Sequence, residues 1–269
     1  MKHALILGGT RGIGRALAGR YLERGFGVTV CGRHAQALQG WPLAGHPALR
    51  VATLDIADAA AVHDIVARAG GAEGTLDVLA VTAGQYFDTR DHALDAAATL
   101  HLLRTNVSGL GSAFEAGARR MLAQGHGRMA AVSSMAGLLK DYPGASVYGA
   151  TKRAVLGLCA TYRKALAPFG IPVTALVPGY VDTERLRELN GGDARHKPFL
   201  MSEEAAVARM LRAIDRGMAV DAFPWQMRAA VALLNLVPHL SRVPDFPAPA
   251  GPDSGAVKHS IGVPRDTLE

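Results

Sequence analysis

A tyrosine and a lysine four residues apart, Tyr148 and Lys152, are the side chains of this sequence best suited to acid–base chemistry. They begin an apolar run that predicts a largely buried helix ending near Pro168. Residues four apart on a helix project from one face, so the phenol and the ammonium would lie close together. A neighbouring cation lowers the pKa of a phenol from its ordinary value of ~10 toward the range useful for proton transfer. By itself, such a pair is more often no more than two residues on the rim of a core helix.

A serine upstream gives the pair a partner. Ser133 and Ser134 close an apolar run, residues 129–132, that predicts a short buried strand. Open α/β sheets bind ligands at the carboxyl ends of their parallel strands. Ser134 could therefore hydrogen-bond a carbonyl oxygen while Tyr148 protonates it.

A glycine-rich turn stands near the start of the chain. Gly8, Gly12 and Gly14 have the spacing G-x-x-x-G-x-G, between a predicted strand at His3–Leu7 and a predicted helix over residues 15–23. Backbone without Cβ atoms lets a pyrophosphate approach, and the helix N-terminus offers free N–H groups to it. The turn therefore indicates a nucleotide site.

Together these motifs resemble the short-chain dehydrogenase/reductase family, from about residue 3 to about residue 185 and more loosely to about 240. The resemblance implies a single α/β domain with a doubly wound, mostly parallel seven-stranded Rossmann sheet. It implies that Tyr148 donates the proton and that Ser134 orients the substrate oxygen. It further implies that Lys152 holds the nicotinamide ribose and lowers the pKa of the tyrosine, and that Asn106 maintains a water relay.

The resemblance also implies a set of residues that contact the cofactor. They are Gly8, Thr10, Arg11, Gly12, Ile13, Gly14, Asp55, Ala83, Gly84, Tyr148, Lys152, Pro178, Gly179, Val181 and Thr183. Asp55 could equally cap the helix predicted around residues 59–69. The chain departs from the family pattern at Leu7 and at Val81-Thr82, and the step from Ser134 to Tyr148 is one residue longer than usual.

The end of the second predicted strand, residues 27–33, bears on the choice of cofactor. In dinucleotide folds a carboxylate at this point binds the adenosine ribose and selects NAD. Here the strand ends in Gly32 and Arg33, and Arg11 supplies a second cation from the glycine turn. Two guanidinium groups suit the 2′-phosphate of NADP, so we expect NADP(H) as the cofactor.

Composition excludes several classes of protein. The chain has 269 residues, 49% of them hydrophobic and 19% charged, which excludes a mainly disordered protein. Its formal charge of +6 comes from scattered Lys and Arg residues, so we expect a basic surface and no nucleic-acid partner. Two cysteines in apolar segments, no signal peptide and no long apolar run predict a cytoplasmic protein without a transmembrane segment. We expect no metal ion.

The chain is expected to divide into a catalytic domain over residues 1–242 and a flexible Pro- and Gly-rich tail over residues 243–269. Within the domain, residues 184–201 are predicted to form a substrate lid and residues 224–240 a C-terminal helix. The apolar composition of that helix favours a core or subunit contact, and we expect a homo-oligomer. A membrane-surface helix that makes a peripheral contact is the alternative.

These features predict an oxidoreductase that transfers a hydride between NADP(H) and a carbonyl or secondary alcohol. An apolar substrate is indicated by side chains expected around the site: Tyr86, Leu138, Leu139, Tyr142, Tyr180, Leu186, Phe199 and Met201. The alternative is a non-catalytic NADP-binding redox sensor or scaffold, in which Ser134, Tyr148 and Lys152 would have no chemical task.

The tail gives the first testable prediction. Because residues 243–269 lack hydrophobic periodicity, removing those beyond about 245 should leave folding and NADP binding intact. Thermal unfolding and NADPH titration of the full-length and shortened proteins measure this. Insoluble shortened protein, or a large fall in the thermal midpoint, would mean that the tail packs on the domain or on a neighbouring subunit.

Overall fold

A computed structural model describes residues 1–70, 74–86, 96–140 and 146–236 of the protein. Tyr142 and the tail predicted over residues 243–269 lie outside these ranges. The domain division made from the sequence therefore stays a prediction for the tail, and the same holds for the last residues of the predicted C-terminal helix.

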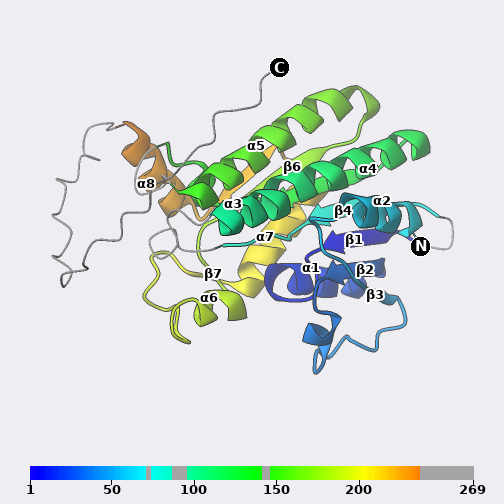
Figure 1. Cartoon of the computed structure of the whole chain (residues 1–269), viewed down its shortest axis with the longest axis horizontal. Helices are drawn as coiled ribbons and strands as arrows, with labels where there is room; N and C mark the ends of the chain where they lie inside the picture. Colours follow the sequence, from blue (N-terminus) through cyan, green and yellow to red (C-terminus); the bar gives the residue numbers. More distant parts are fainter. Residues whose placement is uncertain (71–73, 87–95, 141–145, 237–269) are drawn as a thin grey trace, which may run out of the picture.

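Seven parallel strands form the central sheet, in the order β3-β2-β1-β4-β5-β6-β9 (Figure 1). The order runs outward in both directions from β1, which confirms the doubly wound seven-stranded sheet expected from the sequence. Every residue of β1 and β6 is buried, as is usual for strands covered on both faces. The strands are β1 His3–Leu7, β2 Gly27–Gly32, β3 Leu49–Thr53, β4 Val78–Val81, β5 Arg128–Val132, β6 Val173–Pro178 and β9 Val220–Phe223.

Helices cover both faces of the sheet. One apolar cluster joins α2, α4 and α5 to the sheet around Phe114, and a second joins α1 and α7 to the opposite face around Tyr21. In Figure 1, α2, α4 and α5 lie side by side in the upper part of the molecule, and α1 and α7 lie together lower down. The helices are α1 Gly12–Glu23, α2 Ala59–Arg68, α3 Ala96–Leu103, α4 Gly109–Gln124, α5 Val147–Leu166, α6 Glu184–Glu188, α7 Glu203–Asp215 and α8 Trp225–Leu236.

One of the two readings of Asp55 is excluded. Helix α2 is capped by Asp58, whose side chain accepts a hydrogen bond from the backbone N–H of Ala61, so Asp55 is not its cap. Asn106 lies in a π-helical turn, Arg104–Ser108, between α3 and α4. Such turns are frequent at functional sites, because the extra residue re-aims a side chain.

The segment predicted as a lid is held at both of its ends. Strand β7, Val181–Asp182, pairs in parallel with β8, Met201–Ser202, and α6 lies between them. Strand β9 then forms one edge of the large sheet, and α8 follows it. Among the described helices, none is long and apolar enough to cross a membrane.

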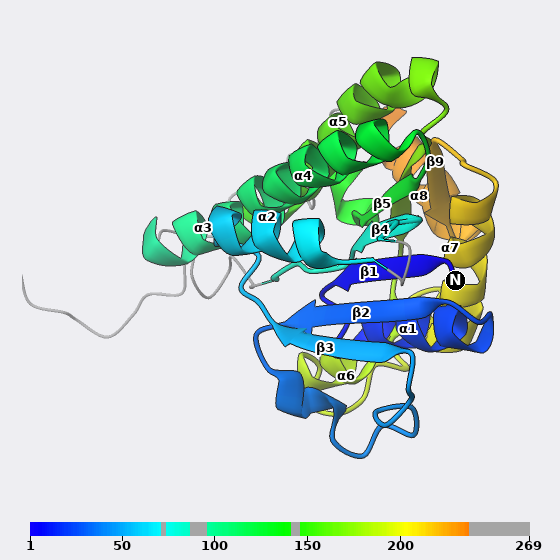
Figure 2. The same ribbon diagram turned by 90° about the vertical axis from the view of Figure 1, so that its right-hand side faces the viewer.

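The strand order brings distant parts of the chain to one edge of the sheet. Because all seven strands are parallel, their carboxyl ends share that edge, and the segments after β1, β4, β5 and β6 become neighbours (Figure 2). These segments carry the glycine turn, Gly84, Ser134 and Gly179. The fold thus assembles the residues that the sequence analysis singled out.

Candidate active site

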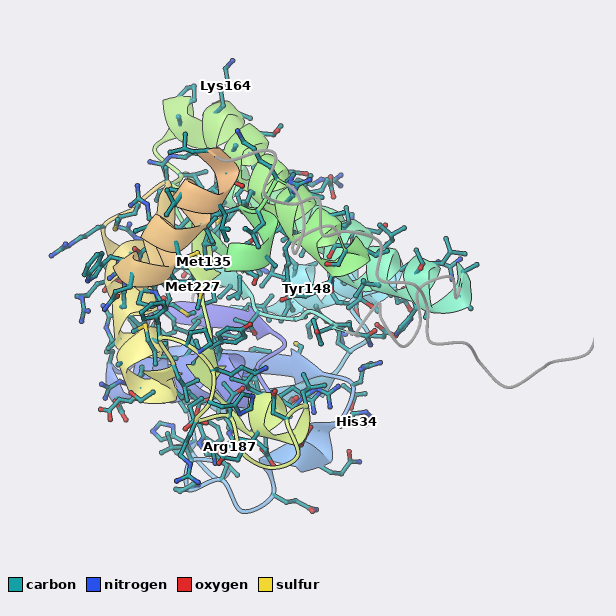
Figure 3. The ribbon with its side chains drawn as sticks, turned by 90° about the vertical axis from the view of Figure 1, so that its left-hand side faces the viewer. His34, Met135, Tyr148, Lys164, Arg187 and Met227 are labelled. Carbon is teal, nitrogen blue, oxygen red and sulfur yellow. The ribbon has the colours of Figure 1, made fainter. Side chains whose placement is uncertain are left out.

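Tyr148 lies in the first turn of α5. The helix begins there because Ser146 caps it, accepting a hydrogen bond of 3.0 Å from the backbone N–H of Gly149. Figure 3 shows Tyr148 and Lys164 at opposite ends of the helix, with Tyr148 at the end nearer the middle of the molecule. The Ser134 side chain lies close enough to the Tyr148 phenol to lower its pKa, as the sequence analysis expects for the two groups that would hold a substrate oxygen.

Lys152 lies one turn further along α5 and is only 5% exposed. Its Nζ donates a 3.0 Å hydrogen bond to the carbonyl of Val132 and lies 5.7 Å from the centre of the Tyr148 ring. Burial lowers the pKa of the Lys152 ammonium to about 8. The side chain is therefore still largely charged at neutral pH and sits beside the phenol.

The phenol itself behaves differently from the expectation. Burial raises the pKa of Tyr148 to about 12, the nearby Ser134 hydroxyl lowers it, and the nearby Tyr86 raises it further. Tyr86 packs edge-on against Tyr148 with ring centres 5.0 Å apart. In the protein alone the loss of hydration dominates, so the pKa of Tyr148 lies above its ordinary value, and the lowering expected from Lys152 stays a prediction.

Asn106 is buried and its side-chain amide is fully engaged with protein groups. Its Oδ1 accepts from the backbone N–H of Gln85 at 2.7 Å, and its Nδ2 donates to the Gln85 carbonyl at 3.0 Å and to the Thr151 hydroxyl at 3.1 Å. The Thr151 hydroxyl in turn donates to the carbonyl of Tyr148 at 2.8 Å. Asn106 thus ties the segment after β4 to the first turn of α5.

The glycine turn packs tightly against the segment after β4. A Cβ atom at Gly8 would lie 2.3 Å from the backbone nitrogen of Ala83, and one at Gly14 would lie 2.4 Å from the Thr82 hydroxyl. Gly12, with a φ of +51°, faces the side chain of Thr183 instead, at 3.7 Å. The turn and the segment after β6 therefore line the same space, next to the N-terminus of α1.

The two arginines expected to bind the 2′-phosphate are both exposed. With its oxygen turned toward Arg33, the Gln85 amide lies 3.0 and 3.1 Å from the two terminal nitrogens of that guanidinium. Gly32 has a packing reason of its own: a Cβ there would lie 2.5 Å from the buried Thr10 hydroxyl. A carboxylate at position 32 is thus disfavoured by space as well as by charge.

The remaining residues carried over from the family take varied positions. Asp55 is exposed and accepts a 3.0 Å hydrogen bond from the Ala57 N–H within its own turn. Thr183 caps α6 through the N–H of Leu186. A Cβ at Gly179 would lie 2.5 Å from the Met227 sulfur, so this turn is pressed against α8. Two further members of the set, Ile13 and Val181, belong to the apolar cluster of α1 and α7, and Pro178 is buried at the end of β6.

The apolar side chains expected around the substrate are only partly brought together. Leu138 and Leu139 pack in a small cluster with Met135, directly after Ser134. Met201 instead packs against the cluster of α1 and α7. The exposed ring of Tyr180 has the Lys197 ammonium over it, 5.4 Å from its centre. The other two, the half-buried Leu186 and the exposed Phe199, lie in the segment predicted as a lid.

Two residues that the sequence analysis passed over hold the site in place. The Ser133 hydroxyl donates a 2.7 Å hydrogen bond to the Lys152 carbonyl, fixing α5 against the end of β5. Adjacent strand residues point to opposite sides, so the serine pair itself signals that one hydroxyl serves the helix and the other the site. Asn235 of α8 hydrogen-bonds to the backbone at residues 138 and 140. These residues are far apart in the sequence, so no local pattern indicated the contact.

Comparisons with known proteins agree with this geometry. A family model described as short chain dehydrogenase matches residues 2–194. The chain is 32% identical to the sorbitol dehydrogenase of Cereibacter sphaeroides, over 81% of this chain and 89% of the relative. It is also 32% identical to a solved short chain dehydrogenase/reductase family protein, with a TM-score of 0.71 over 81% of this chain and 93% of that one. A serine dehydrogenase complexed with NADP+ is 26% identical, with a TM-score of 0.70 over 78% and 88%.

The buried ammonium gives a prediction for stability. The folded protein releases the Lys152 proton near pH 8, whereas the unfolded chain keeps it to about 10.5. Between these values the unfolded state binds more protons, so the unfolding free energy rises with pH by about 1.4 kcal/mol per unit. Denaturant unfolding of wild type and Lys152→Met from pH 7 to 9.5 should show this gain in wild type only. The matched variant Lys164→Met, at an exposed position of the same helix, should follow wild type. If the difference in unfolding free energy between wild type and Lys152→Met stayed constant or fell with rising pH, the lowered pKa of Lys152 would be contradicted.

Proposed function

The chain belongs to the short-chain dehydrogenase family, and we propose that it transfers a hydride between NADP(H) and a carbonyl or secondary alcohol. The observation that carries the proposal is that the Ser134 hydroxyl and the Lys152 ammonium both lie beside the Tyr148 phenol, with the ammonium 5.7 Å from the centre of its ring. A hydroxyl, a phenol and a cation in this arrangement meet the needs of proton transfer to a substrate oxygen.

The side chains would divide the work as follows. NADPH supplies the hydride that reduces the carbonyl carbon. Ser134 orients the carbonyl oxygen, and its Oγ is itself positioned by a 3.2 Å hydrogen bond from the Ala136 N–H. Tyr148 gives its proton to that oxygen. Burial keeps this phenol protonated, which is the form that reduction requires, and the Lys152 ammonium stabilises the phenolate as the proton leaves.

A proton must then return to Tyr148, and the space beside Gly84 offers a route. A Cβ at Gly84 would lie 3.0 Å from the Lys152 Nζ and 3.5 Å from the Asn106 Oδ1. The missing side chain thus leaves room between an ammonium and an amide oxygen, which is a polar setting suited to a bound water. We propose that Asn106 and Lys152 hold the relay here, in addition to the role of Asn106 in binding Gln85.

The residues around the glycine turn fit a dinucleotide. Gly12 presents backbone without a side chain at the N-terminus of α1, opposite Thr183, and this suits a pyrophosphate. Arg33 and Arg11 are exposed at the adenosine end of the proposed site, where they would bind a 2′-phosphate. The NADP+ complex of the related serine dehydrogenase supports this choice.

For the substrate we propose an apolar molecule. Met135, Leu138 and Leu139 pack together directly after Ser134, and Tyr86 lies against Tyr148. Contacts of this kind favour the binding of substrates that carry an apolar or aromatic group beside the carbonyl. The relatives carry different substrates in their names, so this part of the proposal depends on the side chains alone.

Replacing Tyr148 by Phe tests the chemistry. The change removes only the hydroxyl, so turnover of NADPH with a carbonyl panel should fall by about 10²–10⁴-fold, while the Kd for NADPH stays within about twofold. Tyr162→Phe is the matched control, since Tyr162 lies on the same helix and packs edge-on against Phe114. Near-normal turnover by Tyr148→Phe would rule the assignment out. A wild-type protein that binds NADPH but reduces nothing would favour the redox sensor or scaffold.

Arginine substitutions test the cofactor. One charge-assisted hydrogen bond contributes about 1.5–3 kcal/mol, so the preference for NADPH over NADH in kcat/KM should fall at least about tenfold in Arg33→Ala with Arg11→Ala. The comparison is made at one salt concentration, with Lys164→Ala as the control for lost positive charge. Alanine at both positions leaves Gly32 free of the clash described above. A wild-type preference for NADH would refute the proposal.

A further inference from the structure

The backbone that follows the catalytic serine is held by a side chain from the far end of the chain. The Asn235 Oδ1 accepts a 2.9 Å hydrogen bond from the Lys140 N–H, and its Nδ2 donates a 2.8 Å bond to the Leu138 carbonyl. One amide therefore satisfies two backbone groups of the short segment at residues 138–140, as a neighbouring strand would. On the other side, Arg153 of α5 donates to the Leu139 carbonyl.

Asn235 belongs to an inward-facing stripe of α8. Met227, Val231 and Asn235 follow one another at intervals of four, so they share one face of the helix. Met227 presses on Gly179, and Val231 is buried in the cluster that contains Met135 (Figure 3 shows Met227 near Met135). This stripe thus touches both the turn after β6 and the segment after Ser134.

The opposite face of α8 makes little contact with the rest of the domain. Trp225, Leu233 and Leu236 are 70%, 64% and 76% exposed. The helix therefore packs on the domain through its inward-facing stripe, and Asn235 makes the polar contacts of that stripe near the C-terminal end of the helix. The amide offers one donor for the Leu138 carbonyl and one acceptor for the Lys140 N–H, and it does so without a charge.

We propose that Asn235 is a positioning residue that sets the shape of the substrate site. It holds residues 138–140 at a fixed distance from Ser134 and Tyr148, and so determines how large a group fits beside the reacting carbonyl. The two hydrogen bonds from Asn235 to Leu138 and Lys140 are called the clamp from here on. The effect on catalysis rests on the proposed function, but the clamp itself is a property of the cofactor-free protein.

Two substitutions separate the parts of the clamp. Asn235→Leu removes both hydrogen bonds at similar volume. Asn235→Asp keeps the acceptor for Lys140, but its ionised carboxylate repels the Leu138 carbonyl, whereas the protonated carboxyl restores a donor. The control Leu234→Asp places the same charge one residue away, on the exposed face.

The clamp is measured first without any substrate. Hydrogen exchange of the Lys140 amide, followed by NMR, should be about three- to tenfold faster in Asn235→Leu, because a single hydrogen bond contributes about 0.5–1.5 kcal/mol. It should stay unchanged in Leu234→Asp. Unchanged exchange in Asn235→Leu would overturn the clamp, whatever the enzyme reduces.

The effect on the site is measured as selectivity. In Asn235→Leu, the ratio of KM for a bulky apolar ketone to that for a small one should change at least about fivefold, with the Kd for NADPH within twofold of wild type. In Asn235→Asp, the ratio should change in the same direction, because the carboxylate stays ionised at neutral pH, keeps the acceptor and lacks the donor. In Leu234→Asp, which carries the same charge without touching the two hydrogen bonds, the ratio should stay at its wild-type value. Faster exchange with unaltered selectivity would overturn the role in substrate choice. No reduction of any ketone by wild type would instead contradict the proposed function and leave the exchange result standing.

Discussion

The hydrogen bond from the Lys152 ammonium to the Val132 carbonyl joins helix α5 to the end of strand β5, and the rest of the site depends on that junction. The Ser133 hydroxyl doubles it by bonding the Lys152 carbonyl, and Gly137 permits it because a Cβ there would lie 2.8 Å from the same carbonyl. Without this contact, Ser134 and Tyr148 would belong to separate elements with no fixed distance between them. The burial that the junction requires also shifts the pKa of the lysine and of the tyrosine in opposite directions.

Hydrophobic patterning predicted individual strands, because strands covered on both faces leave continuous apolar runs in the sequence, and the family resemblance supplied the seven-stranded sheet. The resemblance also singled out Ser134, Tyr148 and Lys152, and the fold brings them to one edge because parallel strands end together. The pKa of Tyr148 could not be read in the same way. Its sign depends on how much protein surrounds the hydroxyl, and spacing along a helix says nothing about that. The partner of Asn235 lies 95 residues earlier in the chain, so no local pattern could identify it.

Two asparagines use the same chemistry at two strand ends. Asn106 pairs its amide with the backbone N–H and carbonyl of Gln85 after β4, and Asn235 does so with Lys140 and Leu138 after β5. In both cases a side-chain amide pairs with one backbone N–H and one backbone carbonyl, as the backbone of a neighbouring strand would. Irregular segments beside the catalytic groups are thereby given a defined position.

The contact between Arg33 and Gln85 has a consequence for protein engineering. A series of hydrogen bonds runs from Arg33 to the Gln85 side chain, from the Gln85 backbone to Asn106, and on through Thr151 to the Tyr148 carbonyl. The residue proposed to lie at the adenosine end is thus connected to the helix turn that carries the phenol. Exchanging Arg33 to retarget the enzyme to a cheaper coenzyme would remove one partner of the Gln85 side chain and leave it with His101. A redesign of the proposed coenzyme site would therefore also alter a contact that leads to the turn of Tyr148.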